Sequence, residues 1–188
     1  VVVGGGGVVV NGKSYLDSDS HYFTSQLHVK THTKGPKRKV NMPFPYQNQC
    51  LTIVVVGASG DLAKKKTYPS LFELYCQDYL PKQGSLSIVG YARSAYTDDT
   101  FREKMRVAIG ERGDRSKIDE FLGCCRYQRG ETYDDIEAWV QLNLRQQTVE
   151  DTVLANRLFY FAIPPEQFAP SARAITQAAQ SSSGWNRF

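Results

Sequence analysis

Apolar runs without polar alternation recur along the second part of the chain. The first, residues 51–56, holds five apolar side chains and one threonine. Such a run is typical of a strand buried on both faces, as in a parallel sheet covered by helices. By the same criterion the sequence predicts strands at 51–56, 86–91 and 157–163, a short strand near 126–128, and the start of another at Trp185.

Between these runs, apolar residues recur at helical spacing. The pattern predicts helices near 62–79, 98–109, 116–123, 134–144 and from 165 to about 180. Thr97 is a suitable N-cap for the second helix, and Pro69 either starts a regular segment or kinks the first one. Strands separated by helices favour right-handed crossovers and one fold class, a Rossmann-like, doubly wound α/β parallel sheet.

One face of the helix predicted at 134–144 is expected to pack on the sheet. Its apolar positions are Ile136, Trp139, Val140 and Leu144. Such a stripe of apolar residues at helical spacing is typical of a helix that covers a sheet on one side.

The link between the first strand and the first helix carries the main candidate chemistry. Gly57 permits a tight turn, Gly60 has no Cβ to block a pyrophosphate, and Ala63 lets the helix lie close to the strand. The GxxGxxA spacing alone leaves open a tight turn without a ligand. The buried strand before it, the helix after it and the second strand at the expected distance favour a dinucleotide. A mononucleotide P-loop is a poor alternative, because GxxxxGK followed by Ser or Thr is absent.

Backbone N–H groups at the start of that helix are expected to hold the pyrophosphate, since a helix N-terminus carries partial positive charge. Ser59 can add its hydroxyl, and Asp61 is interpreted as a helix N-cap that keeps the loop rigid. The candidate phosphate-binding residues are Gly57, Ala58, Ser59, Gly60, Asp61 and Leu62.

The end of the second strand indicates which dinucleotide binds. Many NAD-binding sheets place an acidic residue there for the ribose 2′-hydroxyl, whereas this chain has Arg93 and no acid from Gly84 to Tyr96. A guanidinium can donate two hydrogen bonds to a 2′-phosphate and stack on adenine. The alternative is a solvated surface arginine. The sequence therefore predicts NADP as the cofactor, held in part by Arg93.

Four segments of the chain closely resemble glucose-6-phosphate dehydrogenase. They are Gly57-Ala-Ser-Gly-Asp-Leu-Ala-Lys-Lys-Lys-Thr-Tyr-Pro69, Val89-Gly-Tyr-Ala-Arg-Ser94, Asn156-Arg-Leu-Phe-Tyr-Phe-Ala-Ile-Pro-Pro165 and Gly184-Trp-Asn-Arg187. The resemblance covers about residues 49–188 in unbroken order. It implies an NADP-dependent oxidoreductase that converts glucose 6-phosphate to 6-phosphogluconolactone, the entry step of the oxidative pentose phosphate pathway. For the full-length enzyme it also implies a homo-oligomer.

The resemblance assigns three further cofactor contacts. It places Lys66 near the 2′-phosphate and leaves Lys64 and Lys65 in solvent. It places Pro164 beside the nicotinamide, and it aligns Phe168 with a position where the family commonly has tyrosine. Phe168 keeps an aromatic ring for stacking but loses the hydroxyl.

No catalytic residue is assigned in this chain. The family's Glu-Lys-Pro segment with the substrate lysine, and its Arg-Ile-Asp-His-Tyr segment, are absent before Phe188, and the only histidines are His21, His28 and His32. Removing hydride from a sugar carbon needs a base for the hydroxyl proton. The chain is therefore expected to be an inactive amino-terminal part of the enzyme, with its sheet truncated. The alternative is a standalone NADP-binding sensor or scaffold.

Charge and composition separate two regions. Residues 1–50 hold six basic and two acidic side chains, while 51–188 hold 17 of each. The neutral second region argues against a nucleic-acid partner, and the Gly-interrupted run at 1–10 is too short to span a membrane. We expect a flexible extension at 1–48, whose basic cluster 34–39 is a solvated linker or a targeting patch, and an NADP-binding domain at 49–188.

The four cysteines have no metal-ligand spacing, and no metal is predicted. Without a secretion signal, reduced thiols in the cytoplasm are expected, with an organellar pool as a further option. Cys50 and Cys76 are interpreted as core residues, with a redox switch as the alternative.

Overall fold

The computed structural model describes residues 3–4, 7–10, 13–15, 49–110, 114–150 and 154–188. The chain divides into two compact units, 1–41 and 42–188. In the first unit, β1 (Val3–Gly4), β2 (Gly7–Val10) and β3 (Lys13–Tyr15) form an antiparallel sheet. The three histidines and the basic cluster 34–39 lie outside the described residues, so flexibility of the extension stays a prediction.

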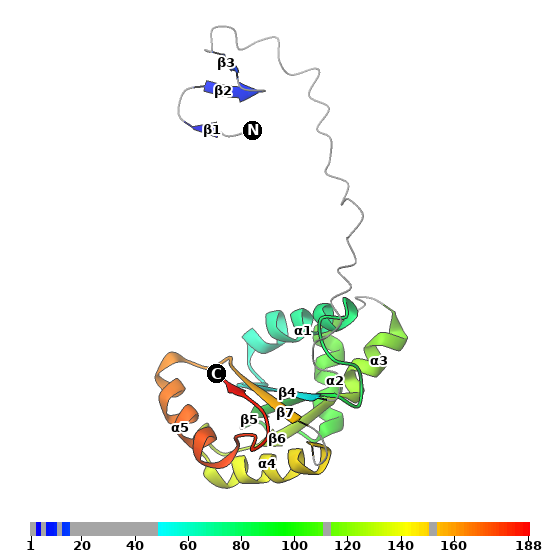
Figure 1. Ribbon diagram of the computed structural model, residues 1–188, viewed down its shortest axis with the longest axis vertical. Coiled ribbons are helices and arrows are strands. Elements are labelled where there is room, and N and C mark those ends of the chain that lie inside the picture. Colours follow the sequence, from blue (N-terminus) through cyan, green and yellow to red (C-terminus); the bar gives the residue numbers. More distant parts are fainter. Residues whose placement is uncertain (1–2, 5–6, 11–12, 16–48, 111–113, 151–153) are drawn as a thin grey trace. The chain divides into compact units, whose positions relative to one another are not determined.

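The second unit is built on a five-stranded parallel sheet in the order β6-β5-β4-β7-β8 (Figure 1). The first strand of the unit, β4, lies in the middle, with two strands on each side of it. The chain therefore winds outward twice from β4, which confirms the Rossmann-like, doubly wound sheet. The strands are β4 (Gln49–Val56), β5 (Leu86–Ala92), β6 (Cys125–Arg129), β7 (Leu154–Phe161) and β8 (Asn186–Arg187).

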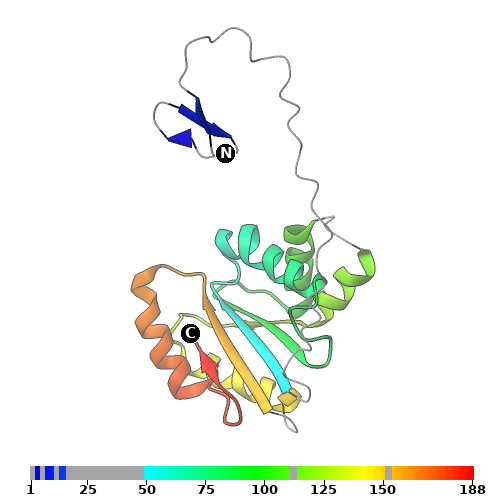
Figure 2. The ribbon, with the colours of Figure 1, turned by 45° about the horizontal axis from the view of Figure 1, so that its top comes forward.

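Helices cover both faces of this sheet, α1 to α3 on one side and α4 with α5 on the other (Figures 1 and 2). Strand β4 serves both layers, because Ile53 and Val55 join the first core and Val54 and Val56 the second. The helical segments are the π-helical turn η1 (Ala63–Thr67), α1 (Tyr68–Cys76), α2 (Asp98–Ile109), α3 (Arg115–Gly123), α4 (Ile136–Glu150), the 3₁₀ turn η2 (Pro165–Gln167) and α5 (Phe168–Ala178).

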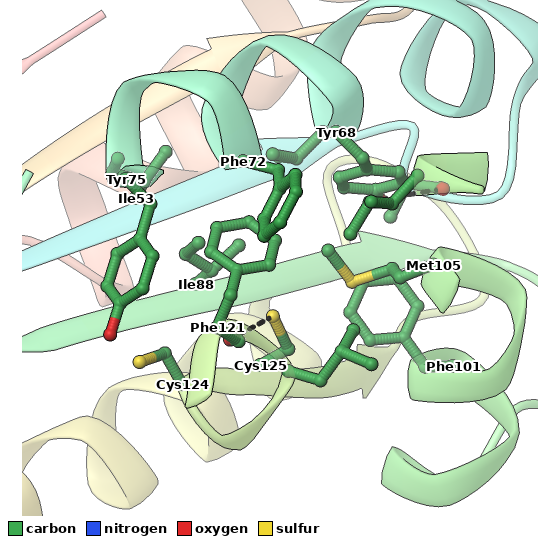
Figure 3. Packing of buried hydrophobic residues seen from close by; sticks show 14 of the residues in the cluster. Ile53, Tyr68, Phe72, Tyr75, Ile88, Phe101, Met105, Phe121, Cys124 and Cys125 are labelled. Atoms are coloured by element: carbon green, nitrogen blue, oxygen red, sulfur yellow. Dashed lines mark hydrogen bonds between the residues drawn. The ribbon is translucent and has the colours of Figure 1, made fainter. Parts of the chain in front are cut away.

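Aromatic side chains fill much of the larger core, between the sheet and α1 to α3. Phe72 and Tyr75 both contact Phe121, and Tyr68 contacts Phe101 edge to face (Figure 3). Cys50 is buried, as predicted, whereas Cys76 at the end of α1 is only partly buried. Burial raises the pKa of Cys124 to about 11 and that of Cys125 well above its usual value.

The start of α2 lies where the sequence predicts it, whereas the buried face of α4 differs from the prediction. Thr97 caps α2, since its hydroxyl oxygen accepts a hydrogen bond from the Thr100 amide at 3.1 Å. The predicted face of α4 is wrong in part, because Ile136 and Leu144 are exposed. The helix also extends to Glu150, and its inward face includes polar side chains.

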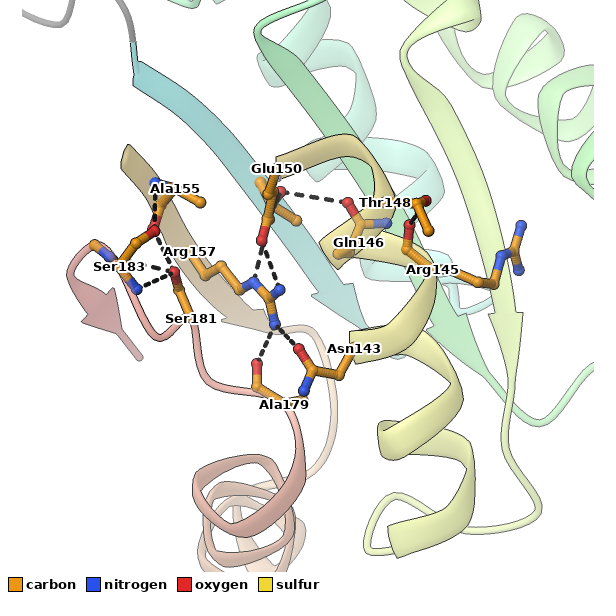
Figure 4. Close-up of polar contacts among 12 residues, drawn as sticks. Asn143, Arg145, Gln146, Thr148, Glu150, Ala155, Arg157, Ala179, Ser181 and Ser183 are labelled. Atoms are coloured by element: carbon orange, nitrogen blue, oxygen red, sulfur yellow. Dashed lines mark hydrogen bonds and ion pairs between the residues drawn. The ribbon is translucent and has the colours of Figure 1, made fainter. Parts of the chain in front are cut away.

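Those inward polar side chains form a buried network with residues in the middle of β4 and β7 (Figure 4). Arg157 of β7 pairs with Glu150 at 2.6 Å and also donates to Asn143 and to the Ala179 carbonyl. The Thr52 hydroxyl of β4 donates to the same Glu150 carboxylate at 2.8 Å. The network ties β4, β7, α4 and the residue after α5 together.

Candidate functional site

Gly57 ends strand β4 in a conformation that requires glycine. Its φ is +89°, a region that L side chains rarely adopt. A Cβ at this position would also lie 2.4 Å from the Ala162 carbonyl oxygen, just beyond the end of β7. The first glycine of the predicted motif is thus fixed by backbone geometry and by the close approach of a neighbouring strand.

Only some of the loop amides are open to a ligand. The amides of Gly57 and Ala58 both donate to the Tyr91 carbonyl, at 2.9 and 3.1 Å, and the Gly60 amide donates to the Gly57 carbonyl. The open amides, without a hydrogen-bond partner in the described part of the chain, are those of Ser59, Asp61 and Leu62. The predicted phosphate cradle is therefore narrower than the full run from Gly57 to Leu62.

Two buried residues, Tyr68 and Ala63, support the loop on its core side. The Tyr68 hydroxyl donates to the Ala58 carbonyl at 2.8 Å, and burial raises the pKa of Tyr68 well above its usual value. This hydroxyl therefore stays a donor at any ordinary pH. Ala63 is fully buried, in agreement with its predicted role as the small residue between helix and strand.

Asp61 does not cap the helix, which corrects the sequence interpretation. Its carboxylate pairs with Lys65 one turn later, at 2.8 Å, and hydrogen bonding to Lys65 lowers the pKa of Asp61. Lys65 offsets the negative charge of Asp61, which would otherwise repel a phosphate. Because Lys65 is already paired with Asp61, it is not free to bind a ligand. Lys66 is exposed, and its placement near a 2′-phosphate stays a prediction.

Arg93 directly follows β5, and its backbone is fixed on both sides. The buried Tyr127 hydroxyl lies 2.8 Å from the Ser94 carbonyl oxygen and 3.1 Å from that of Ala92. The exposed guanidinium of Arg93 lies 5.7 Å from the centre of the Tyr133 ring. Among the described residues no carboxylate pairs with Arg93, so the guanidinium is available to an anion.

Pro164 and Phe168 lie beyond the end of β7. Pro164 has an extended backbone and precedes the 3₁₀ turn, and Phe168 begins α5. The Phe168 ring is 39% exposed and lies 5.3 Å from that of Phe161. Gly57, Arg93 and Pro164 thus follow the carboxyl ends of three adjacent strands, where doubly wound sheets bind their ligands.

Three buried tyrosines that support this edge were missed by the sequence interpretation. Tyr91 and Tyr127 hydrogen-bond backbone carbonyls 41 and 33 residues away, and Tyr68 hydrogen-bonds the carbonyl of Ala58, ten residues before it. No local pattern marks Tyr91 or Tyr127, because their partners are distant in the chain.

The sheet is parallel and doubly wound, a glycine turn follows its central strand, and the next strand is followed by an arginine with no carboxylate partner among the described residues. Together these features define a dinucleotide-binding domain of the Rossmann type. The sequence matches the family "Glucose-6-phosphate dehydrogenase, NAD binding domain" over residues 54–188. The chain belongs to this glucose-6-phosphate dehydrogenase family.

Relatives from several organisms agree with this assignment. The chain is 41% identical over 146 residues to "Glucose-6-phosphate 1-dehydrogenase 3, chloroplastic" of Arabidopsis thaliana, covering 75% of this chain and 24% of the relative. It is 37% identical over 149 residues to the cytoplasmic isoform of glucose-6-phosphate 1-dehydrogenase from Solanum tuberosum, covering 73% and 28%. The chain thus spans about a quarter of the curated relatives it matches.

Solved structures share the fold. A structure titled "Glucose-6-phosphate dehydrogenase in complex with its substrate glucose-6-phosphate" superposes with a TM-score of 0.68 at 34% identity, covering 76% of this chain and 30% of that one. The enzyme from Mycobacterium avium superposes with a TM-score of 0.59 at 26% identity, covering 73% and 29%.

Neither a membrane-spanning helix nor a cluster of metal-ligating side chains is present among the described residues. Within the described ranges, none of the helices has the length and apolarity needed to cross a bilayer. The same residues contain no group of three or more His, Cys, Asp or Glu side chains arranged to hold a metal ion.

Proposed function

We propose that this chain is the coenzyme-binding part of an NADP-dependent enzyme that oxidises glucose 6-phosphate to 6-phosphogluconolactone. The single observation that carries the cofactor choice is Arg93, whose backbone is held after β5 and whose guanidinium has no carboxylate partner among the described residues. Membership of the glucose-6-phosphate dehydrogenase family supports the reaction. Nothing in the fold or in the comparisons favours a standalone sensor or scaffold.

The phosphates of NADP would be bound at two places on the carboxyl edge of the sheet. The open amides of Ser59, Asp61 and Leu62 suit the pyrophosphate, because they lie at a helix N-terminus with partial positive charge. Gly60 leaves space for it. Arg93 can pair with the 2′-phosphate through charge-assisted hydrogen bonds, and Lys66 adds positive charge nearby.

The nicotinamide end would lie toward β7, beside Pro164. When bound, NADP supplies the hydride acceptor for the oxidation. The rigid Pro164-Pro165 pair fixes the chain there, and the part-exposed Phe168 ring offers a stacking surface without a hydroxyl. Glucose 6-phosphate is proposed to be a partner of the full-length enzyme, which membership of the glucose-6-phosphate dehydrogenase family supports.

The full-length enzyme is proposed to be a homo-oligomer. Its compartment is proposed to be the cytoplasm, with an organelle as the alternative, since the matched relatives include both cytoplasmic and chloroplastic isoforms.

Titration of matched variants with NADP and NAD tests the cofactor assignment. Arg93→Ala should remove a charge-assisted pair worth roughly 1.5–3 kcal/mol. We therefore expect the affinity for NADP to fall about tenfold or more, with NAD binding little changed. Arg129→Ala is the control, because Arg129 ends the adjacent strand but pairs with Glu131 at 2.7 Å. Equal losses for both cofactors in Arg93→Ala would contradict the assignment.

A further inference from the structure

The loop between β6 and α4, residues 130–135, is held by long-range hydrogen bonds. The Gly130 amide donates to the Ala92 carbonyl at 3.2 Å, at the end of β5. The Tyr91 hydroxyl donates to the Thr132 carbonyl at 2.8 Å. Strand β5 therefore fixes the first half of the loop beside the segment that carries Arg93.

The second half of the loop is fixed from α4. The Trp139 indole nitrogen donates to the Tyr133 carbonyl at 3.0 Å. Asp135 accepts hydrogen bonds from the amides of Glu131 and Ala138, at 2.9 and 3.1 Å, and so closes the loop on itself.

A stacked aromatic pair supports both halves. The rings of Tyr91 and Trp139 lie 3.9 Å apart and nearly parallel, at 7°, and both side chains are fully buried. Gly130 lies so close to this pair that a Cβ there would be 1.9 Å from the Tyr91 hydroxyl. Contacts with β5 and α4 thus hold the loop at Gly130, Thr132, Tyr133 and Asp135.

This loop places Tyr133 beside Arg93. The Tyr133 side chain is partly buried against the second core, and the Arg93 guanidinium lies over its ring at 5.7 Å. No ion pair among the described residues joins Arg93 to the nearby carboxylates. Asp135 accepts hydrogen bonds from two amides, Glu131 is paired with Arg129, and exposed Asp134 forms no ion pair with Arg93.

We propose that Tyr133 is a positioning residue that sets the preference for NADP over NAD by holding the Arg93 guanidinium ready for the 2′-phosphate. This inference rests on the proposed function. A cation above a tyrosine ring is attracted by the ring's negative face. An arginine restrained in this way loses less rotamer freedom when it binds a phosphate, and the affinity rises accordingly. NAD has no 2′-phosphate, so its affinity does not depend on this restraint.

The experiment compares three versions of the full chain in titrations with NADP and with NAD. Tyr133→Leu keeps an apolar side chain of similar bulk but removes the ring, and Tyr133→Phe keeps the ring. We expect Tyr133→Leu to weaken NADP binding about two- to fivefold with NAD unchanged. Tyr133→Phe should bind both as the unmodified chain does. Circular dichroism confirms that each variant is folded.

The double variant Arg93→Ala/Tyr133→Leu separates positioning from a structural role. Because Tyr133 acts through Arg93, the double variant should bind NADP as weakly as Arg93→Ala alone. Additive losses, equal losses for NADP and NAD, or no loss in Tyr133→Leu would each overturn the inference. If Arg93→Ala loses NADP selectively while Tyr133→Leu does not, only this inference fails. If the unmodified chain does not prefer NADP, the proposed function fails and this inference with it.

Discussion

Replacing Glu150 by alanine should destabilise the domain more than any exposed charge change. Glu150 is buried, and its carboxylate accepts hydrogen bonds from the Arg157 guanidinium at 2.6 and 3.2 Å and from the Thr52 hydroxyl at 2.8 Å. Alanine at this position leaves Arg157, which is only 1% exposed, as a buried charge without its carboxylate.

The expected size of the loss follows from that burial. Breaking a buried ion pair by removing one partner costs roughly 3–5 kcal/mol. This is a large share of the roughly 5–15 kcal/mol by which a domain of this kind is stable. Replacing both partners, as in Glu150→Leu/Arg157→Met, should cost less than Glu150→Ala, because no unpaired charge then remains.

Urea unfolding followed by circular dichroism measures the effect. With a slope of roughly 1–3 kcal/mol per molar urea, the midpoint for Glu150→Ala should fall by at least about 1 M. Asp61→Ala is the control, since the Asp61–Lys65 pair has a similar separation of 2.8 Å but both side chains are exposed. Its midpoint should stay unchanged. Similar midpoints for Glu150→Ala and Asp61→Ala would refute the reasoning.

Three shorter predictions concern the loop, the chemistry and the thiols. Gly60→Val should abolish binding of both cofactors in calorimetry while the fold survives. Gly57→Val should unfold the domain, because of these two glycines only Gly57 has a positive φ and would place a Cβ 2.4 Å from a neighbouring backbone oxygen. Retained binding in Gly60→Val would mean that the turn is purely structural. The purified chain with saturating NADP and glucose 6-phosphate should produce no NADPH by absorbance, because the described residues include no histidine to take the hydroxyl proton; turnover that follows the protein through a final column would contradict this. The pKa of Cys124 is raised to about 11, so the thiol keeps its proton at pH 8. Iodoacetamide should therefore modify the folded chain at Cys124 only as the pH approaches 11. Rapid modification at pH 8 would show that the thiol is more accessible to solvent than its burial indicates.

The elements that are encoded locally could be predicted from the sequence. The buried strand β4, the glycine turn after it and the Thr97 cap each depend on neighbouring residues, and each lies where its pattern places it. The order of helices and strands was enough to predict the doubly wound sheet.

Features that depend on distant partners could not be predicted in this way. Leu144 completes an apolar stripe in the sequence but is exposed, whereas the buried face of α4 includes Gln146 and also Glu150, which pairs with distant Arg157. Asp61 has the chemistry of a cap, yet Lys65 one turn later attracts its carboxylate.

The supports of Arg93 are another feature of this kind. Tyr127 and Tyr133 come from strand and loop segments far along the chain, and neither has a motif. Only the pairing of β5 with β6 brings these tyrosines to the arginine.

A crystal structure of this chain with NADP tests the central claim most directly. The account predicts the pyrophosphate within hydrogen-bond distance of the amides of Ser59, Asp61 and Leu62, and the 2′-phosphate on the guanidinium of Arg93. NADP bound at this edge with its 2′-phosphate away from Arg93, or its pyrophosphate away from the loop, would contradict the account.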